Sequence, residues 1–371
     1  MKFSTTSNEL QKVLGNIGGV IPTKSTLPIL ENFLFQLQKD TLKITATDLD
    51  ITTTVELTVK GSEDGTIAIP AKKLFETVRS LPNVNIDFSA DTSTNKIIMA
   101  TQTGEYKLTG ESSENYPSFP SFKGENKLDM SSDLLKRLIS KTLFAVSNDE
   151  LRPAMMGILF QIRKNEMRAV STDGHRLVRI IASKFKSENS EQDIVIPAKA
   201  VNLVIKSLYE DRTTISFGEN HAKFVMGNMV LITRIIEEKY PNYESVIPKD
   251  NDKILIANKD EILSSARRTA LYASASTHQV RFSIKKGTLK ISAEDVEVGS
   301  EAFEKLDCDY SAEEMEIGFN AGYIIDILSH IDTEEVMFKF NSPTRAVIVE
   351  PVKQQESEDL LMLVMPVRLN V

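Results

Sequence analysis

The chain repeats one pattern three times, and this repetition constrains its fold more than any other feature. The three copies are TLKITATDLD at 41–50, EMRAVSTDGH at 166–175 and TLKISAEDVE at 288–297. Each reads as an alternating strand that runs into an aspartate, and Asp48, Asp173 and Asp295 are 125 and 122 residues apart. Solenoid units are about 20–50 residues long, so this longer period indicates three copies of a whole domain.

Two further landmarks keep a similar spacing. One is a strand–helix segment, found as AIPAKKLFETVRSL at 68–81, VIPAKAVNLVIKSL at 195–208 and IGFNAGYIIDILSH at 317–330. The other is a Tyr-Pro pair at 116–117 that recurs 124 residues later at 240–241. A unit of this length has the usual size of a domain with its own core. The repeats therefore predict three domains, at residues 1–124, 125–249 and 250–371.

Each repeat combines two helical segments with about eight strands. Apolar residues recur at helical spacing in the segments 7–19, 71–80, 132–146, 198–208, 259–271 and 320–331. Ser7, Ser132 and Asn258 are the expected N-caps of three of these helices. Antiparallel strands with few helices on one side predict an α+β layer architecture.

Composition excludes several classes of protein. No apolar run approaches the ~20 residues that a membrane helix needs, and the opening segment MKFSTTSNEL lacks the apolar stretch of a signal peptide. The single Cys308 excludes an intrachain disulfide framework and fits a reducing compartment. No Cys or His residues have zinc spacing. We therefore expect a cytoplasmic protein without a metal or other cofactor.

Charge is distributed unevenly along the chain. The net charge is −8, yet the six expected helices together carry +6, which leaves −14 on the strands and loops. Helix surfaces often carry Lys and Arg simply as solvated charge. The other interpretation is that one basic face meets a polyanion while the acidic remainder repels it.

Four motifs in the chain are specific enough to suggest a family. They are TLPIL at 26–30, TDGHRL at 172–177, EMEIGFN at 314–320 and MPVRL at 365–369. In this order they resemble the bacterial sliding clamps, the beta subunits of DNA polymerase III, over the whole chain. The resemblance implies three repeated domains of the DNA-clamp fold, joined head-to-tail in a homodimer ring whose helices line the hole.

The same resemblance implies a function without catalysis. The chain would be a non-catalytic subunit of the DNA polymerase III holoenzyme, a processivity factor that encircles double-stranded DNA without reading its sequence. A hydrophobic pocket would tether the clamp loader, replicative and translesion polymerases, ligase and mismatch-repair proteins. No membrane partner is implied.

The resemblance also assigns residues to three surfaces. The partner peptide pocket would comprise Met155, Thr172, Gly174, His175, Arg176, Leu177, Pro241, Val246, Asn320, Tyr323, Thr344, Ala346, Leu363, Val364, Met365, Pro366, Val367 and Arg368. The DNA-facing residues would be Lys24, Lys72, Lys73, Arg79, Lys136, Arg137, Lys141, Lys199, Lys206, Arg267 and Arg268. The dimer interface would include Lys73, Lys96, Tyr106, Lys107, Leu108, Leu271, Tyr272, Glu297, Glu301 and Glu304.

The chain departs from the family pattern at two places. Family members often have aromatic residues just before the pocket, where this chain has Pro153 and Ala154. The chain also continues to Asn370 and Val371, beyond the usual terminus. Both departures bear on the peptide preference of the pocket.

Two other functions compete with the clamp interpretation. His175 beside Asp173 suggests half of a catalytic dyad, but in a TDGH turn the aspartate is expected to cap the turn. The equivalent residues of the other repeats, Asp50 and Glu297, are not histidines. A scaffold that binds proteins without encircling DNA would share the pocket but would not need basic helices.

Overall fold

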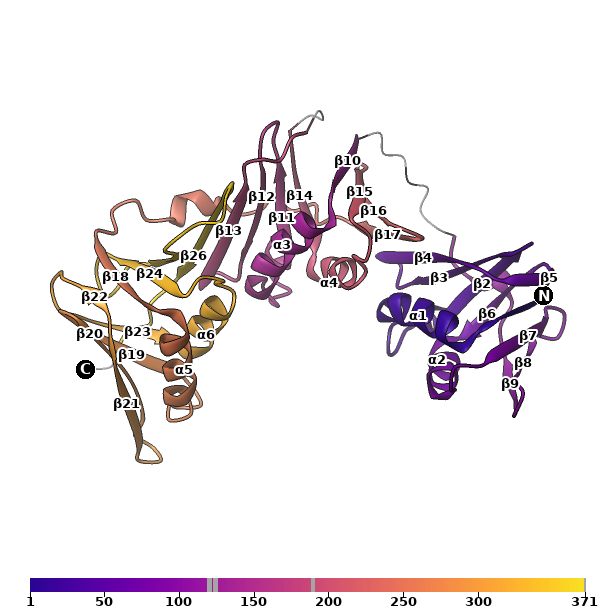
Figure 1. The fold of residues 1–371 in the computed structure, drawn as a ribbon, viewed down its shortest axis with the longest axis horizontal. Coiled ribbons are helices and arrows are strands. Elements are labelled where there is room, and N and C mark those ends of the chain that lie inside the picture. The colour runs from indigo at the N-terminus through magenta and orange to yellow at the C-terminus, as the bar shows by residue number, and fades with distance from the viewer. Residues whose placement is uncertain (119–121, 123–125, 188–190, 370–371) are drawn as a thin grey trace. The chain divides into compact units, whose positions relative to one another are not determined.

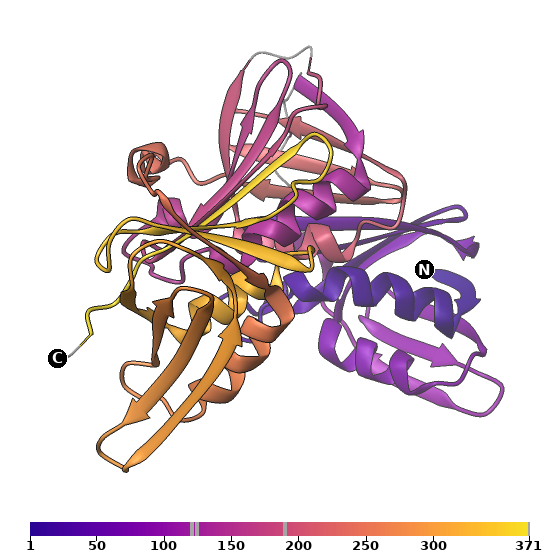
Figure 2. The same ribbon diagram turned by 60° about the vertical axis from the view of Figure 1, so that its left-hand side comes forward.

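The structure is a computed structural model that describes residues 1–118, 122, 126–187 and 191–369. The chain forms two compact units, which are Met1–Lys136 with Lys199–Ile235, and Arg137–Ala198 with Ile236–Val371. Each unit holds one large and one small antiparallel sheet (Figures 1 and 2). The expected boundary between residues 124 and 125 falls outside the described residues, as do Asn370 and Val371.

The first unit contains a five-stranded and an eight-stranded sheet. The small sheet has the order β5 (Lys60–Glu63), β1 (Lys2–Thr6), β7 (Asn85–Asp91), β8 (Lys96–Ala100), β9 (Glu105–Thr109). The large sheet has the order β10 (Asn126–Ser131), β15 (Arg212–Phe217), β16 (His221–Met226), β17 (Met229–Arg234), β4 (Ile51–Thr58), β3 (Thr41–Thr47), β2 (Asn32–Gln38), β6 (Gly65–Pro70). The helices α1 (Ser7–Ile17) and α2 (Ala71–Ser80) pack against each other.

The second unit contains a nine-stranded and a four-stranded sheet. The large sheet has the order β14 (Gln192–Pro197), β11 (Gly157–Ile162), β12 (Met167–Thr172), β13 (Arg176–Ala182), β26 (Glu358–Val364), β25 (Val347–Pro351), β24 (Glu335–Phe340), β18 (Lys253–Asn258), β22 (Asp309–Tyr310). The small sheet has the order β21 (Ser300–Asp307), β20 (Thr288–Asp295), β19 (Gln279–Lys285), β23 (Met315–Asn320). The helices α5 (Lys259–Ala270) and α6 (Ala321–Ser329) pack against each other.

Each large sheet is assembled from two repeats of the sequence. In the first unit β17 pairs with β4, for example Leu231 with Thr53. In the second unit β13 pairs with β26, for example Leu177 with Leu363. The middle repeat thus gives strands to both sheets, which explains why the contacts group into two units. Pairing across repeats also removes strand edges that would otherwise be open to aggregation.

The structure tests the N-cap residues that were predicted from the sequence. Asn258 caps α5 by accepting from the Glu261 amide at 3.0 Å, as predicted. Ser7 was the wrong choice for α1, because Thr6 accepts from the Glu9 amide and forms a capping box with that residue. Ser7 is instead the first helical residue and donates to the Pro82 carbonyl at 2.7 Å. Ser132 was likewise the wrong choice for α3, because it is the first helical residue and the Leu134 amide donates to Ser131 Oγ at 3.4 Å.

The remaining helices α3 (Ser132–Thr142) and α4 (Ala198–Lys206) both come from the middle repeat. They bury one apolar stripe each, with Leu135, Leu138, Val201 and Val204 inaccessible to solvent. Such a stripe is the usual face of an amphipathic helix that packs on a sheet. Within the described residues, no helix has the length and apolar character required to cross a membrane.

Candidate functional site

A tight turn between β12 and β13 forms the floor of the candidate site. The Asp173 carboxylate accepts hydrogen bonds from the backbone amides of His175 and Arg176, both at 2.9 Å. Gly174 has φ +90, and a Cβ at this position would lie 2.8 Å from Arg152 Nη1. Only glycine adopts this conformation without strain. The expectation that the aspartate caps the turn is confirmed, and no Asp–His dyad forms.

Arg176 is the polar centre of the site. Its guanidinium donates to the Asp173 carboxylate at 3.1 Å, to the Asp326 carboxylate and to the Phe144 carbonyl at 2.8 Å. The same group lies 4.8 Å from the centre of the Tyr323 ring. Its side chain is only 11% exposed. These contacts fix the orientation of Arg176 before any ligand arrives, so that little ordering cost remains.

A cavity of about 700 Å³ opens beside this turn, within the size range of ligand pockets. Three parts of the second unit line it, namely the strands around the turn, a continuous linker segment and the end of the β25–β26 hairpin. The lining residues are Met155, Thr172, Gly174, His175, Arg176, Leu177, Pro241, Asn242, Tyr243, Glu244, Ser245, Val246, Ile247, Pro248, Lys249, Thr344, Arg345, Ala346, Leu363 and Met365. We call this cavity the groove.

The end of β26 contributes one apolar wall of the groove. Leu363 is opposite Leu177 in the pairing of β26 with β13. The next exposed side chain is Met365, which is 39% accessible and whose amide donates to the His175 carbonyl at 2.8 Å. A flexible thioether at the rim suits a surface that adapts to several ligands. Met365 therefore offers the exposed apolar contact that a ligand side chain would bury, whereas Leu363 behind it is only 2% exposed.

Six residues assigned to the pocket by resemblance do not line the groove. Val364 points to the opposite face of the sheet and is fully buried, because neighbouring residues of a strand alternate between faces. Asn320 caps α6 by accepting from the Gly322 amide at 2.9 Å. Tyr323 stands at the margin, where its ring stacks on His175 with centroids 6.0 Å apart. The other three, in the segment after β26, are Pro366, Val367 and Arg368.

The groove also contains residues that sequence reasoning missed. They are Asn242, Tyr243, Glu244, Ser245, Ile247, Pro248, Lys249 and Arg345. All but Arg345 belong to the linker segment 241–249, whose members Pro241 and Val246 were named. Residues 242–245 lie between the two predicted residues Pro241 and Val246. Their position in the sequence could therefore have extended the predicted pocket to the whole segment.

Comparisons with known proteins agree along the whole chain. Three family models match in order: the N-terminal domain of the DNA polymerase III beta subunit at residues 1–120, the central domain at 129–242 and the C-terminal domain at 244–368. The chain belongs to the DNA polymerase III beta subunit family. The family resemblance inferred from the sequence is thereby confirmed.

Individual relatives support the same assignment. The beta sliding clamp of Chlamydia muridarum is 30% identical, and the alignment covers all of both chains. Crystal structures of the sliding clamps of Pseudomonas aeruginosa and Bartonella birtlesii match with TM-scores of 0.92 and 0.94 at 28% identity, again over all of both chains. The protein has the sliding-clamp fold, and it is a processivity factor of DNA replication rather than a catalytic subunit.

The eleven basic residues assigned to the DNA surface of this clamp fall into three groups, namely seven residues that form no ion pair in the described part of the chain, the paired Lys199 and Arg268, and Arg137 and Lys141. Seven are exposed, and among the described residues none of the seven forms an ion pair; they are Lys24, Lys72, Lys73, Arg79, Lys136, Lys206 and Arg267. Lys199 is paired with Asp48, and Arg268 donates to both oxygens of Glu304 at 2.6 Å. Their charges are largely neutralised within the chain.

Arg137 and Lys141 require a correction. Lys141 is buried, and its ammonium donates to Asp332 and to the His330 carbonyl, both at 2.6 Å. Arg137 donates to both oxygens of Glu358 and to Asp332. Burial lowers the pKa of Lys141, although Asp332 opposes that shift. Neither side chain presents a free cation to DNA; both fasten α3 to elements more than 180 residues away in sequence.

The residues assigned to the dimer interface lie on two unpaired sheet edges or beside them. Tyr106, Lys107 and Leu108 belong to β9, the last strand of the five-stranded sheet. Glu301 and Glu304 belong to β21, the last strand of the four-stranded sheet. Exposed apolar side chains accompany the second edge, with Phe303 55% and Leu271 83% accessible. The other assigned residues, Lys73, Lys96, Tyr272 and Glu297, are also at the surface.

Proposed function

We propose that this clamp holds its partners by binding short peptides in the groove. The observation that supports this proposal is the pairing of apolar walls, formed by Leu177, Val246 and Leu363, with a locked polar centre at Arg176. Binding sites for small ligands and peptides combine such apolar walls with a few oriented polar groups. The partners proposed are the clamp loader, replicative and translesion polymerases, ligase and mismatch-repair proteins.

Ligands of related clamps supply a probe for the groove. The clamps of Pseudomonas aeruginosa and Bartonella birtlesii have been solved bound to griselimycin. We propose that griselimycin binds this chain in the groove, against Met365. Met365→Ala should raise the Kd about five-fold, measured by isothermal titration calorimetry, while the protein stays folded and dimeric. An unchanged Kd would place the binding site elsewhere.

The proposed action on DNA is encirclement by a head-to-tail homodimer in the bacterial cytoplasm. In this arrangement β9 of one copy pairs with β21 of the other, which removes two exposed edges at each interface. The seven exposed basic residues would meet phosphates without reading bases, so that the ring can slide. In this proposal each copy contributes three domains to the ring, at residues 1–124, 125–249 and 250–371.

A scaffold that binds proteins without encircling DNA would share the groove. Charge reversal separates the two functions. Changing Lys72, Arg79, Lys136 and Lys206 to Glu, which spares the proposed interface residue Lys73, should reduce loading on DNA and leave griselimycin affinity unchanged. If loading on DNA were unchanged, these basic residues would not contact the phosphates as proposed. Reversing Arg137 or Lys141 would not serve, because both side chains hold the fold together.

A further inference from the structure

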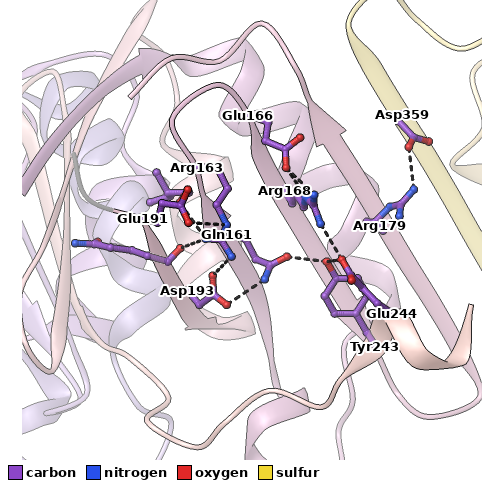
Figure 3. A network of polar contacts seen from close by, with 12 residues as sticks. Gln161, Arg163, Glu166, Arg168, Arg179, Glu191, Asp193, Tyr243, Glu244 and Asp359 are labelled. Carbon is purple, nitrogen blue, oxygen red and sulfur yellow. Dashed lines mark hydrogen bonds and ion pairs between the residues drawn. The ribbon is translucent and has the colours of Figure 1, made fainter. Parts of the chain in front are cut away.

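One face of the large sheet in the second unit is divided into an apolar and a polar part. The apolar part lies next to the groove and includes Leu159, Val170, Val195 and Leu361. Two residues further along their strands the same face carries the polar row. Its members are Gln161, Arg168, Asp193 and Asp359, and Arg179, which lies opposite Val170 and Leu361, reaches the row by pairing with Asp359 (Figure 3). Gln161 lies opposite both Arg168 and Asp193 in the strand pairing, so the row crosses the sheet.

The linker segment 241–249 covers the apolar part and forms one whole side of the groove. Tyr243 anchors it, since its ring is 5% exposed and packs in the same cluster as Leu159 and Val170. Val246 remains 54% exposed and faces the groove. The position of this segment on the sheet therefore sets the distance between Val246 and the opposite wall.

The polar row holds the middle of the segment. The Tyr243 hydroxyl donates to Gln161 Oε1 at 2.6 Å, and Arg168 Nη1 donates to Glu244 Oε1 at 2.8 Å (Figure 3). Both holding groups are themselves oriented. Glu166 accepts from Arg168 Nε at 2.7 Å, and Asp193 accepts from the Gln161 amide at 3.0 Å.

Burial lowers the pKa of Arg168, but its hydrogen bonds to Tyr243 and Glu166 outweigh that effect and raise the pKa overall. Arg168 thus stays charged wherever the protein is folded. Other contacts hold the chain on either side of the segment. Before it, the Ile236 amide donates to the Val195 carbonyl, and after it, Asp250 forms an ion pair with Arg345. Among the described residues, the side-chain hydrogen bonds that join the segment 241–249 to the sheet are made by Gln161 and Arg168. Gln161 accepts from Tyr243, and Arg168 donates to Glu244.

We propose that Arg168 and Gln161 are positioning residues for peptide binding, which fix the wall 241–249 although neither lines the groove. The proposal rests on the proposed function of the groove. If either bond is lost, the wall samples other positions, and only the fraction of molecules with the wall in place binds the ligand well. The affinity then falls by that fraction, with no change in the groups that touch the ligand.

The test measures griselimycin binding to the full-length dimer by surface plasmon resonance. Arg168→Ala should raise the Kd about five-fold, mostly through faster dissociation. Tyr243→Phe, which removes a single hydroxyl and keeps the ring, should act in the same direction. Lys339→Ala is the control, because Lys339 lies on β24 of the same sheet and pairs with Glu350 at 2.6 Å, outside the polar row and the segment. It should leave the Kd unchanged.

A double-mutant cycle separates positioning from a general loss of stability. Arg168→Ala with Glu244→Ala should weaken binding by less than the sum of the two single changes, because both remove the hydrogen bond between Arg168 and Glu244. Wild-type affinity in both Arg168→Ala and Tyr243→Phe would overturn the inference, as would an equal loss in Lys339→Ala. A wild-type protein that does not bind griselimycin would overturn the proposed function together with the inference. Wild-type binding that only Met365→Ala weakens would overturn the inference alone.

Discussion

The turns 47–51 and 172–176 occupy the same place in two repeats and share one hydrogen-bond pattern. In the first, Asp48 accepts from the amides of Asp50 and Ile51, and the Leu49 amide donates to Thr47 Oγ1 at 3.1 Å. In the second, Asp173 accepts from the equivalent amides, and the Gly174 amide donates to Thr172 Oγ1, also at 3.1 Å. The middle residues both have positive φ, +80 at Leu49 and +90 at Gly174.

The two turns differ in what their side chains do. Turn 172–176 carries Arg176, which gathers two carboxylates, a carbonyl and two aromatic rings beside the groove. Turn 47–51 has Ile51 at that position, fully enclosed in the core, and its aspartate pairs with Lys199 instead. The comparison indicates that the turn is a structural element of the repeat, and that the residues it carries distinguish the groove from the equivalent place in the first unit.

The largest expected effect comes from removing the polar centre. Arg176→Ala removes the guanidinium donor from Asp173, Asp326 and the Phe144 carbonyl in a nearly buried place, which should cost about 2–3 kcal/mol of unfolding free energy. Lys199→Ala breaks the equivalent but half-exposed pair with Asp48 and should cost about 0–1 kcal/mol. Urea unfolding of both variants measures the difference. Equal losses would mean that the two turns are energetically alike.

A side chain at position 174 should affect binding more than folding. Leu49 shows that the turn accepts leucine at positive φ, so Gly174→Leu should fold with a loss of about 1–2 kcal/mol. The new side chain would displace Arg152 and enter the groove, and griselimycin affinity should fall at least ten-fold, or about 1.4 kcal/mol. Calorimetry on a thermally intact variant provides the measurement. Retained affinity would show that the ligand does not approach this turn.

The two units should also differ in how their unfolding free energy depends on pH, because one has a charged contact where the other has a neutral one. In the second unit Asp332 receives hydrogen bonds from Lys141 and Arg137; burial raises its pKa, but these donors outweigh burial and lower it overall. A carboxylate with a depressed folded pKa stabilises the protein above its unfolded pKa of about 3.9 and loses that effect as the pH falls through the folded pKa. In the first unit the matching contact is neutral, between Tyr209 and Asn16 at 3.3 Å.

Asp332→Asn should therefore lower the unfolding free energy at pH 7, and its difference from the wild type should shrink at pH values below about 3.9. Asn16→Ala should show a small difference that does not depend on pH. Chemical unfolding at a series of pH values compares the two. If Asp332→Asn lowered the unfolding free energy equally at every pH, the ion pairs of Asp332 with Lys141 and Arg137 would not be the stabilising contact.

The smallest expected effect is relief of strain in the first turn. Leucine at φ +80 costs about 1 kcal/mol relative to glycine, and the greater freedom of glycine in the unfolded chain offsets part of this gain. Leu49→Gly should therefore raise the melting temperature slightly. Gly174→Ala provides the opposite change in the second turn and should lower it. A decrease in Leu49→Gly would show that the exposed leucine makes a contact of its own.

Sequence repetition predicted much of the fold because alternation and turn chemistry are local. The strands that run into Asp48 and Asp173 and the helices of the strand–helix segments at 68–81, 195–208 and 317–330 could be placed from such patterns. The sharing of the middle repeat between two sheets could not, because strand pairing such as Leu177 with Leu363 joins distant segments.

The site was predictable to the extent that family motifs cover it. Thr172, Gly174, His175 and Arg176, which TDGHRL assigns to the pocket, line the groove, whereas Val364 is buried on the other face of the sheet, because the motif does not record the face of the strand. Arg137 and Lys141 read as exposed basic residues, since their carboxylate partners Glu358 and Asp332 lie far away in sequence. Charge on a helix indicates a DNA surface only after such pairs are known.

Retention on closed DNA tests the central claim most directly. The protein would be loaded by its loader onto a nicked circle, washed in high salt, and the circle then linearised. A topological ring should stay on the circle in high salt and leave when the DNA is cut, because ionic contacts to phosphates weaken steeply with salt while enclosure does not. Loss from the intact circle in high salt would mean ordinary electrostatic binding and would contradict the ring.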